Sequence, residues 1–378
     1  MASTSGSHFK SSAFDLGKLW YYLTRYIDKF LLIGLLLLMI VGLFTLYSAT
    51  GGDITRVGKQ TLHICVALLV MWLVANVPLQ QIMRLALPLY LVGLILLIGV
   101  ALFGEIHNGA RRWLNIGITR IQPSEIMKIA VPLMMAWYFD KNEITLRLKE
   151  YVGATLILML PVLLILRQPD LGTALLIAVS GFYVLFLAGL SWRIIGGLIV
   201  TALTCVPILW SFMHDYQQRR VLTMLDPSQD PLGAGYHIIQ SSIAIGSGGV
   251  VGKGWQKGTQ AQLDFLPEQS TDFIFAVFSE EFGLIGNSLL LLLYLLVIGR
   301  CMVITANAST QFTRLIAGSI TLTFCTYIFV NMGMVSGILP VVGVPLPLIS
   351  YGGTAMVTML LGFGILMSIQ THPKLVKT

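Results

Sequence analysis

Residues 31–46 read LLIGLLLLMIVGLFTL, and this run without a charged side chain decides the fold class of the chain. A helix needs about 20 predominantly apolar residues to cross a bilayer. The run is long for the apolar part of a signal peptide, and no small-residue cleavage site follows it, so we interpret it as a retained first membrane helix that also targets the chain. The composition agrees, because 11% of the 378 residues are charged, whereas a soluble domain has about 25%.

Nine more apolar runs follow, and together the runs predict ten membrane helices, at residues 30–49, 61–78, 84–103, 124–139, 151–167, 171–189, 193–213, 272–299, 313–336 and 349–370. No run alternates in the manner of a strand, and open sheets cannot satisfy their backbone groups in lipid, so we expect an all-α polytopic membrane fold. The long polar connection, at residues 214–271, lies between the seventh and eighth helices. The predicted parts are a tail at 1–29, disordered over 1–17, a membrane domain at 30–370 and a tail at 371–378.

The basic residues predict the orientation of the helices. With the N-terminus in the cytoplasm, the inner tails and connections hold 13 of the 24 Lys and Arg residues but five of the 17 Asp and Glu residues, as the positive-inside rule requires. Ten helices then place both termini in the cytoplasm and the loop at 214–271 outside it. The inner basic residues are Lys10, Lys18, Arg25, Lys29, Arg84, Lys141, Arg147, Lys149, Arg193, Arg300, Arg314, Lys374 and Lys377.

The other basic residues map to the outer half, where the rule predicts few. They are Arg56, Lys59, Arg111, Arg112, Arg120, Lys128, Arg167, Arg219, Arg220, Lys253 and Lys257. Two interpretations stay open. Each residue can pair with an outer carboxylate, since charges at membrane depth usually pair, or together they can form a surface that binds an anionic lipid headgroup.

Residues 108–128, NGARRWLNIGITRIQPSEIMK, contain the densest part of this basic set. Arg111 and Arg112 can each donate two hydrogen bonds to phosphate oxygens. A helix is expected to start near Gln122, because the Pro that follows it is tolerated in a first turn.

Glu125 and Lys128 in that segment are three positions apart and share a helix face. An ordinary ion pair and a functional pair are both consistent with this spacing. Lys128 lies within an apolar run and must find an anion there.

The large outer loop ends in a glycine-rich segment, GSGGVVGKGWQKGTQ at residues 246–260. It lacks the spacing of a phosphate-binding loop, and no strand precedes it. Its glycines are expected to let the backbone turn tightly against a ligand or a neighbouring helix. Lys253 and Lys257, together with the adjacent Arg219 and Arg220, are candidates for steering an anionic substrate.

Residues 265–283, FLPEQSTDFIFAVFSEEFG, place Asp272 where a polar loop becomes a long apolar segment. Asp272 is expected in the first turn of a helix, at the depth of the lipid headgroups. A capping role and a chemical role for its carboxylate both stay open. Because 27 apolar-rich residues exceed one perpendicular crossing, either the helix tilts or the true span begins near Gly283. Glu280 and Glu281 are expected to be structural.

Two connections between helices stand out. The tight turn RQPD at residues 167–170 is expected to hold a local pair of Arg167 with Asp170. Residues 331–354, NMGMVSGILPVVGVPLPLISYGGT, contain three prolines and cannot form a continuous helix. Such an irregular apolar connection must be buried or line a cavity, and we expect free backbone donors at residues 350–353.

The four cysteines lie far apart, in or at the ends of apolar segments, and show no metal-ligand spacing. Buried, unpaired thiols are expected rather than disulfides. The cysteines are Cys65, Cys205, Cys301 and Cys325.

The segments at 265–283, 108–128 and 331–354, with QPDLGTALL at 168–176, resemble the SEDS family (shape, elongation, division and sporulation). The likeness extends from about residue 104 to residue 370. Within the family, the portion KGWQKGTQ at 253–260 is closer to the rod-shape (RodA) type than to the division (FtsW) type.

The resemblance implies a peptidoglycan glycosyltransferase of the inner membrane that polymerises lipid II on the outer face. It implies that Asp272 is catalytic and that Arg111, Arg112, Glu125 and Lys128 belong to the site. It further implies a class B penicillin-binding protein as transpeptidase partner, beside the nascent glycan strand, membrane lipids and other elongation-complex proteins; nucleic acid is not expected. The full set of expected substrate-binding residues is Arg111, Arg112, Gln122, Glu125, Lys128, Arg219, Arg220, Lys253 and Glu268.

The chemistry of the reaction fits these residues. A glycan 4-hydroxyl attacks an anomeric carbon bearing an α-linked diphosphate, and one carboxylate, Asp272, suffices as general base. The charge on the diphosphate needs cations, which the arginines and Lys128 can supply, with a divalent ion (Mg or Mn) on a carboxylate such as Glu125 as an option. A flippase for the same lipid and a non-enzymatic scaffold for elongation remain the alternatives.

Overall fold

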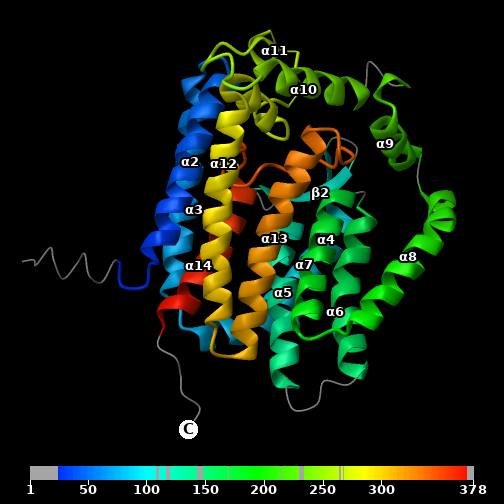
Figure 1. Cartoon of the computed structure of the whole chain (residues 1–378). Helices are drawn as coiled ribbons and strands as arrows, with labels where there is room; N and C mark the ends of the chain where they lie inside the picture. The colour runs from blue at the N-terminus through cyan, green and yellow to red at the C-terminus, as the bar shows by residue number, and fades with distance from the viewer. Residues whose placement is uncertain are drawn as a thin grey trace, which may run out of the picture.

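The computed structural model describes residues 24–107, 110–115, 120–142, 148–168, 170–213, 215–229, 234–263, 265–266 and 268–372. These residues form a bundle of long helices, capped at one end by shorter ones (Figure 1). The long helices are α2 (Lys29–Ala49), α3 (Ile54–Ala75), α4 (Leu79–Phe103), α5 (Pro123–Lys141), α6 (Leu148–Leu166), α7 (Leu171–Leu187), α8 (Trp192–Phe212), α12 (Ile274–Ala306), α13 (Gln311–Val335) and α14 (Gly353–Thr371).

Each of these helices coincides with one of the ten predicted segments. The largest shifts are at the start of α3, which begins seven residues before the predicted position, and at the end of α12, which ends seven residues after it; α4 begins five residues early. For α3 the reason is local. The Asp53 carboxylate accepts hydrogen bonds from the N–H groups of Thr55 and Arg56, so the cap lies upstream of the charged residues that delimited the apolar run.

Within the described part of the chain, seven helices are long and apolar enough to cross a membrane: α2, α3, α4, α6, α12, α13 and α14. The helix α7 and the Trp192–Pro207 part of α8 are shorter apolar helices. The chain is therefore a multi-pass, predominantly helical membrane protein.

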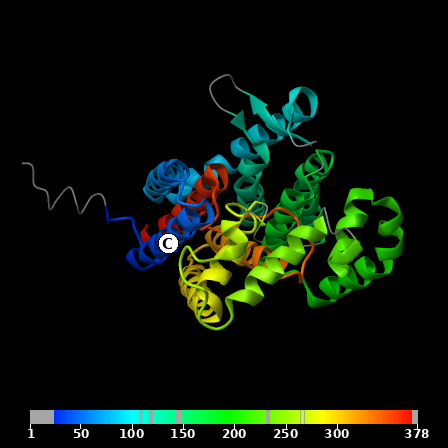
Figure 2. The same cartoon turned by 90° about the horizontal axis from the view of Figure 1, so that it is seen from above.

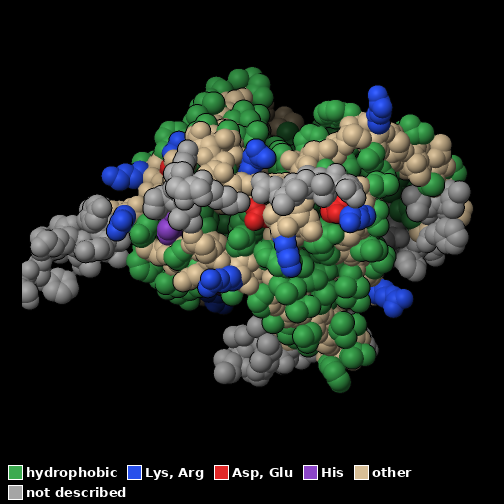
Figure 3. All heavy atoms as spheres, turned by 90° about the horizontal axis from the view of Figure 1, so that it is seen from below, with side chains coloured by type: hydrophobic (Ala, Val, Ile, Leu, Met, Phe, Trp, Pro, Cys, Tyr) green, Lys and Arg blue, Asp and Glu red, His purple; other side chains and the backbone are tan. Residues whose placement is uncertain are grey.

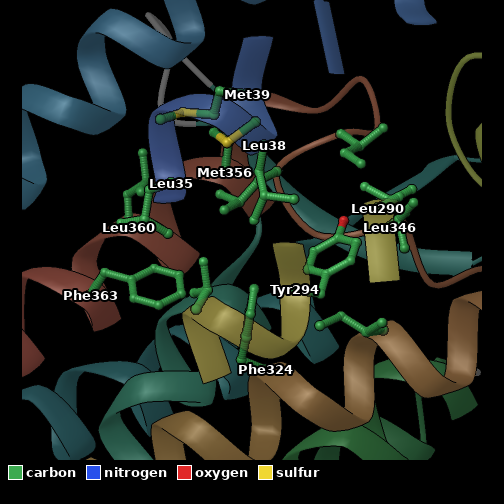
Figure 4. Close-up of a cluster of buried hydrophobic side chains, with 14 of the residues drawn as sticks. Leu35, Leu38, Met39, Leu290, Tyr294, Phe324, Leu346, Met356, Leu360 and Phe363 are labelled. Atoms are coloured by element: carbon green, nitrogen blue, oxygen red, sulfur yellow. The ribbon is translucent and has the colours of Figure 1, made fainter. Parts of the chain in front are cut away.

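Two apolar clusters hold the bundle together. The first joins α2, α3, α12, α13 and α14, and its centre is drawn in Figure 4, where Tyr294 and Phe363 both lie against the ring of Phe324. The second joins α4, α5, α6 and α7. Two helices contribute to both clusters and so connect the two halves of the bundle: α13 through Phe324 and Leu315, and α14 through Phe363 and Ile365.

A small antiparallel sheet lies between α4 and α5, where the sequence predicted no strand. It consists of β1 (Glu105–His107), β2 (Ala110–Asn115) and β3 (Arg120–Ile121) in the order β1-β2-β3. The prediction was wrong for this connection because it was drawn from the apolar runs, and the strands lie outside them. The sheet projects beside the bundle in Figure 2.

The long loop after α8 contains helices rather than coil. It comprises α9 (Asp215–Leu225), the 3-10 turn η1 (Pro227–Gln229), α10 (Ala234–Gly248) and α11 (Thr259–Gln262). The helices α10 and α11 pack on α12 at the end of the bundle where α12 begins, whereas α8 and α9 stand away from α12 in both ribbon views (Figures 1 and 2).

The helix α12 is interrupted at Gly283 (φ 63°, ψ −159°), and residues 246–260, the glycine-rich strap, complete its hydrogen bonding. Ahead of the break, the carbonyls of Glu280 and Glu281 accept from N–H groups of the strap, both at 3.0 Å. After the break, the N–H groups of residues 284–285 donate to strap carbonyls at 3.0 and 3.1 Å. The break coincides with the position near Gly283 that one of the two alternatives for this segment named, and the choice between a tilted helix and a span that begins there stays open. The expected close backbone approach of the glycines to a neighbouring helix is confirmed.

All four cysteines are unpaired, as predicted. Cys301 alone is buried, however, and Cys65 and Cys325 are exposed on apolar helix faces, so the expected burial was wrong for these two.

Candidate functional site

A polar cavity of about 350 Å³ lies where several helices begin. Its polar and charged lining comes from separate parts of the chain: Arg112 on β2, Gln122 before α5, Glu125 and Lys128 on α5, Asp170 before α7, and Asp272 before α12. Residues 342–345 of the irregular connection between α13 and α14 form another wall. Five of the ten residues predicted for the site therefore line one cavity, together with Asp170. The five are Arg112, Gln122, Glu125, Lys128 and Asp272.

The first turns of three helices line this cavity, and a fourth helix begins beside it. Glu125 belongs to the first turn of α5, residues 171–173 to that of α7, and Thr354 to that of α14, while Asp272 lies two residues before α12. A helix N-terminus carries unpaired N–H groups and a partial positive charge, both of which favour anions. Their convergence makes the cavity suited to a phosphate group, beyond what its side chains contribute.

Glu125 and Lys128 form a close ion pair at the wall of the cavity. Pro123 occupies the first turn of α5, as predicted, and the i,i+3 spacing brings Lys128 Nζ within 2.6 Å of Glu125 Oε1. Both side chains are 12% exposed, and Lys128 Nζ also lies 5.4 Å from the centre of the Tyr327 ring. Glu125 Oε2 is buried and has no hydrogen-bond partner among the described residues.

Asp170 is a member of the site that the sequence analysis did not include. Its carboxylate lies 3.8 Å from Arg112 Nε, accepts a hydrogen bond from Gln122 Nε2 at 3.5 Å and caps α7 through the Thr173 N–H group at 3.3 Å. The expected local pair with Arg167 was wrong, because the carboxylate faces the cavity. No pattern along the chain signals this, since Asp170 and Arg112 are 58 positions apart.

Asp272 lies in a turn and not in the first turn of the helix, which corrects the prediction. The N–H groups of Thr271 and Phe273 both donate to the carbonyl of Glu268, and α12 begins at Ile274. The N-cap residue is Phe273, with no side-chain cap hydrogen bond, so the capping interpretation is not supported by the geometry of this helix start. Asp272 is partly exposed and lines the cavity.

The connection between α13 and α14 is irregular and lines the cavity, as predicted, but its backbone donors are not free. The N–H group of Tyr351 donates to the carbonyl of Ser270 at 2.9 Å, and that of Gly352 to Gln60 Oε1 at 3.2 Å. Gln60 Nε2 also donates to the carbonyl of Ser350 at 3.2 Å. The expectation of free donors at residues 350–353 was therefore wrong for these two groups, which hold the connection in place.

Lys253 and Glu268 do not belong to the described lining of the cavity. Lys253 Nζ lies 2.7 Å from the buried Glu280 Oε1 and 2.9 Å from Thr259 Oγ1. Glu268 Oε2 accepts from Thr271 Oγ1 at 2.9 Å. Their contacts are with the protein in this structure, and substrate binding by either residue stays a prediction.

For the remaining three predicted residues the structure describes the backbone but not the side chain, so their roles in substrate binding stay predictions. Arg111 lies on β2 and pairs with Ile106 through the backbone, while Arg219 and Arg220 lie on α9; all three side chains fall outside the described residues. Among the described residues no group of three or more His, Cys, Asp or Glu side chains is arranged to hold a metal ion, so the optional divalent ion also stays a prediction.

An apolar cavity of about 470 Å³ adjoins the polar one, between α7 and α13. The two share Gly172, Leu176, Val342 and Val344 as lining residues. A molecule with a charged head and a long hydrocarbon chain could occupy both at once.

The chain is similar in sequence and in fold to proteins of known function. The chain is 52% identical over 351 residues to the peptidoglycan glycosyltransferase MrdB of Escherichia coli, which covers 93% of this chain and 95% of that protein. It superimposes with a TM-score of 0.79 and 33% identity on a solved structure that describes the structural coordination of polymerisation and crosslinking by a peptidoglycan synthase complex, over 91% of this chain and 97% of that one. The rod shape determining protein RodA of Thermus thermophilus matches with a TM-score of 0.69 and 28% identity, over 91% of this chain and 96% of that one.

The family profile for cell cycle proteins of the FtsW, RodA and SpoVE type matches residues 22–375. This is the family that the motifs predicted, so the resemblance is confirmed. With nearly its whole length matched, the chain belongs to the FtsW/RodA/SpoVE family.

Proposed function

We propose that this chain is a peptidoglycan glycosyltransferase that polymerises lipid II into glycan strands during cell elongation. The observation that carries the proposal is that Asp272 shares one cavity with Arg112 and Lys128, next to an apolar cavity. The names of its relatives supply the reaction class.

The paired cavities suit an amphiphilic, anionic substrate. Lipid II consists of a disaccharide-pentapeptide joined through a diphosphate to an undecaprenyl chain. The polar cavity, with its arginine, lysine and converging helix N-termini, suits the diphosphate, and the apolar cavity between α7 and α13 suits the first part of the hydrocarbon chain.

The reaction is a single displacement with inversion. Asp272 accepts the proton of a glycan 4-hydroxyl as its oxygen attacks the anomeric carbon, and the bond from that carbon to the diphosphate oxygen breaks. Lys128 and Arg112, with Arg111, stabilise the negative charge that develops on the leaving diphosphate. A second, nucleophilic carboxylate is not required, because no covalent glycosyl intermediate forms. Glu125 orients Lys128 through the 2.6 Å contact.

The proposed topology has ten spans, both termini in the cytoplasm and the loop at 214–271 outside the cytoplasmic membrane, so that the active site faces outwards. Figure 3 views the end of the bundle opposite α10 and α11, where Lys and Arg side chains outnumber the acidic ones. The start of α2 and the end of α14 meet at that end. Tyr26, just before α2, stacks on His372, just after α14, with ring centroids 4.5 Å apart. The positive-inside rule makes this the cytoplasmic end.

The proposed partner is a class B penicillin-binding protein, which would add the transpeptidase. Support comes from the solved relative whose structure describes coordinated polymerisation and crosslinking. Other elongation-complex proteins and membrane lipids complete the proposed surroundings, with the nascent glycan strand as second substrate.

The test uses the purified chain with its penicillin-binding partner and labelled lipid II. Wild-type protein is expected to produce long glycan strands, and Asp272→Ala and Asp272→Asn to lose at least about 100-fold in rate, the usual contribution of a general base. A scaffold would make no glycan in any form. A flippase would move labelled lipid II across liposomes equally well with Asp272→Ala, and that result without polymerisation would overturn the proposal.

A further inference from the structure

Beyond the proposed function, and resting on it, the geometry points to Asn331 as a positioning residue that holds the main chain of Asp272 against the opposite wall of the cavity. Asn331 lies on α13, 59 positions from Asp272, and does not line the cavity among the described residues. It would act through Asp272 rather than on the substrate.

The side-chain amide of Asn331 is fully buried and bridges two walls of the site. Its Nδ2 donates to the carbonyl of Asp272 at 2.9 Å and to the carbonyl of Val344 at 2.7 Å. The amide orientation is unambiguous, because the flipped side chain would set Oδ1 against two carbonyl oxygens. Both hydrogens of the amide are therefore committed to the bridge.

The two preceding residues are held from the same side. The carbonyl of Ser270 accepts from the Tyr351 N–H group at 2.9 Å, and that of Thr271 accepts from Ser350 Oγ at 2.7 Å. Three consecutive carbonyl oxygens, at residues 270–272, thus accept from α13 or from the connection that follows it. The turn that carries Asp272 is a docked segment whose position depends on these donors.

Asn331 differs from the other two donors, Tyr351 N–H and Ser350 Oγ, because it binds the residue that carries the reactive carboxylate. It ties Asp272 to Val344, and the neighbouring Gly343 lies beside the carboxylate, where a Cβ would be in ordinary contact with Asp272 Oδ2 at 3.4 Å. The bridge therefore sets the distance from the carboxylate to residues 343–344. A reacting group displaced by about 1 Å can lose 100-fold in rate, so loss of the bridge should affect catalysis more than substrate binding.

The simpler interpretation is that Asn331 only satisfies two buried carbonyls and that its loss affects stability alone. Ser241→Ala is the matched control for this. Ser241 is also buried and donates to a carbonyl of α13, that of Val335 at 2.8 Å, but it is not among the described lining residues of the cavity.

The experiment compares Asn331→Leu, Asn331→Asp and Ser241→Ala in complex with the penicillin-binding partner, normalised to the folded fraction. Asn331→Leu removes both donors and is expected to lower kcat for lipid II about 100-fold while KM changes less than threefold. Asn331→Asp keeps the shape and, when protonated, one of the two donors. Its activity relative to wild type is expected to be intermediate and to rise as the pH falls.

Ser241→Ala should keep kcat within about threefold of wild type, although it also loses a buried hydrogen bond. If Asn331→Leu does not fold, the kcat, KM and pH profile of Asn331→Asp decide the question. Asn331 variants that match Ser241→Ala in kcat, while Asp272→Ala is inactive, would overturn the positioning role and leave the proposed function intact. A fully active Asp272→Ala would instead overturn the proposed function.

Discussion

Lys128 shows how a charge can lie within an apolar helix and remain usable. Its ammonium group contacts the Glu125 carboxylate and the face of the Tyr327 ring, so its burial does not leave an uncompensated charge. The second carboxylate oxygen of Glu125 is left without a partner among the described residues. Stability requires that the charges of Lys128 and Glu125 compensate each other, whereas the proposed function requires the positive charge of Lys128 itself. Mutations of the pair can therefore change one property without restoring the other.

Lys128→Met is expected to lower the free energy of unfolding by about 3 kcal/mol, because it leaves Glu125 buried without its partner. Adding Glu125→Gln should restore most of that stability by removing the orphaned charge. Neither variant should recover polymerisation of lipid II, since both lack the cation. Thermal unfolding in detergent and the lipid II assay measure the two properties; wild-type rates in the double variant would contradict the assigned role of Lys128.

Asp170→Asn tests the residue that the sequence analysis missed. Asn is as good an N-cap as Asp, so α7 should remain capped and the melting temperature should stay unchanged. The carboxylate beside Arg112 is lost, and we expect KM for lipid II to rise roughly three- to tenfold because an ion pair no longer orients the guanidinium. Steady-state kinetics at constant salt provide the measurement. An unchanged KM would show that Asp170 does not contribute to substrate binding.

At the scale of elements, α12 and the glycine-rich strap form one unit. The break at Gly283 exposes backbone groups that an uninterrupted helix would pair internally, and the strap pairs with them. The buried side chain of Glu280 adds further contacts, accepting from the N–H group of Thr259 at 2.8 Å and from Lys253 Nζ at 2.7 Å. The strap thereby anchors the start of α12, the element that follows Asp272.

Two glycines of the strap give a matched pair of variants. A Cβ at Gly252 would lie 2.1 Å from the carbonyl oxygen of Glu281, and the residue has φ +79°. Gly249 also has positive φ, +54°, but a Cβ there meets nothing within 4 Å. Gly249→Ala should cost about 1–2 kcal/mol from the backbone conformation alone. Gly252→Ala should cost a further 1–3 kcal/mol or so through overpacking, visible as a lower melting temperature. Equal losses would show that the close approach is not a constraint.

At the scale of the whole molecule, helix direction explains where the site lies. The helices α3, α5, α7, α12 and α14 occupy even positions in the proposed ten-span order, so in that topology each begins at the outer end. Three of them present first-turn residues to the polar cavity, and α12 begins beside it. An outward-facing anion site therefore follows from the alternation of helix direction, and no single segment encodes it.

Thiol labelling tests this topology. In a variant without native cysteines, Ser228→Cys, after α9, should react with a membrane-impermeant maleimide in intact spheroplasts. Lys149→Cys, in the exposed first turn of α6, should react only after permeabilisation. Labelling of both positions in intact spheroplasts, or the reverse pattern, would overturn the proposed orientation.

Several features could be predicted from the sequence because they depend on neighbouring residues. A long apolar run determines a helix wherever it lies, so all ten predicted segments are helices, and proline and glycine content determined the irregular connection after α13. Helical spacing determined the contact between Glu125 and Lys128. The short sheet at β1–β3 was missed because its strands lie in a connection without a periodic apolar pattern.

The composition of the site depended on tertiary structure. Asp170 meets Arg112, Asn331 reaches the carbonyl of Asp272, and Lys253 pairs with Glu280. These contacts join segments that are distant along the chain, and the relative placement of the segments is set by packing around α13 and α14 rather than by local propensity. The sequence by itself thus determined the helices and the reactive residue types, while tertiary packing decided which side chains meet, because contacts between separate helices exist only after the bundle has formed.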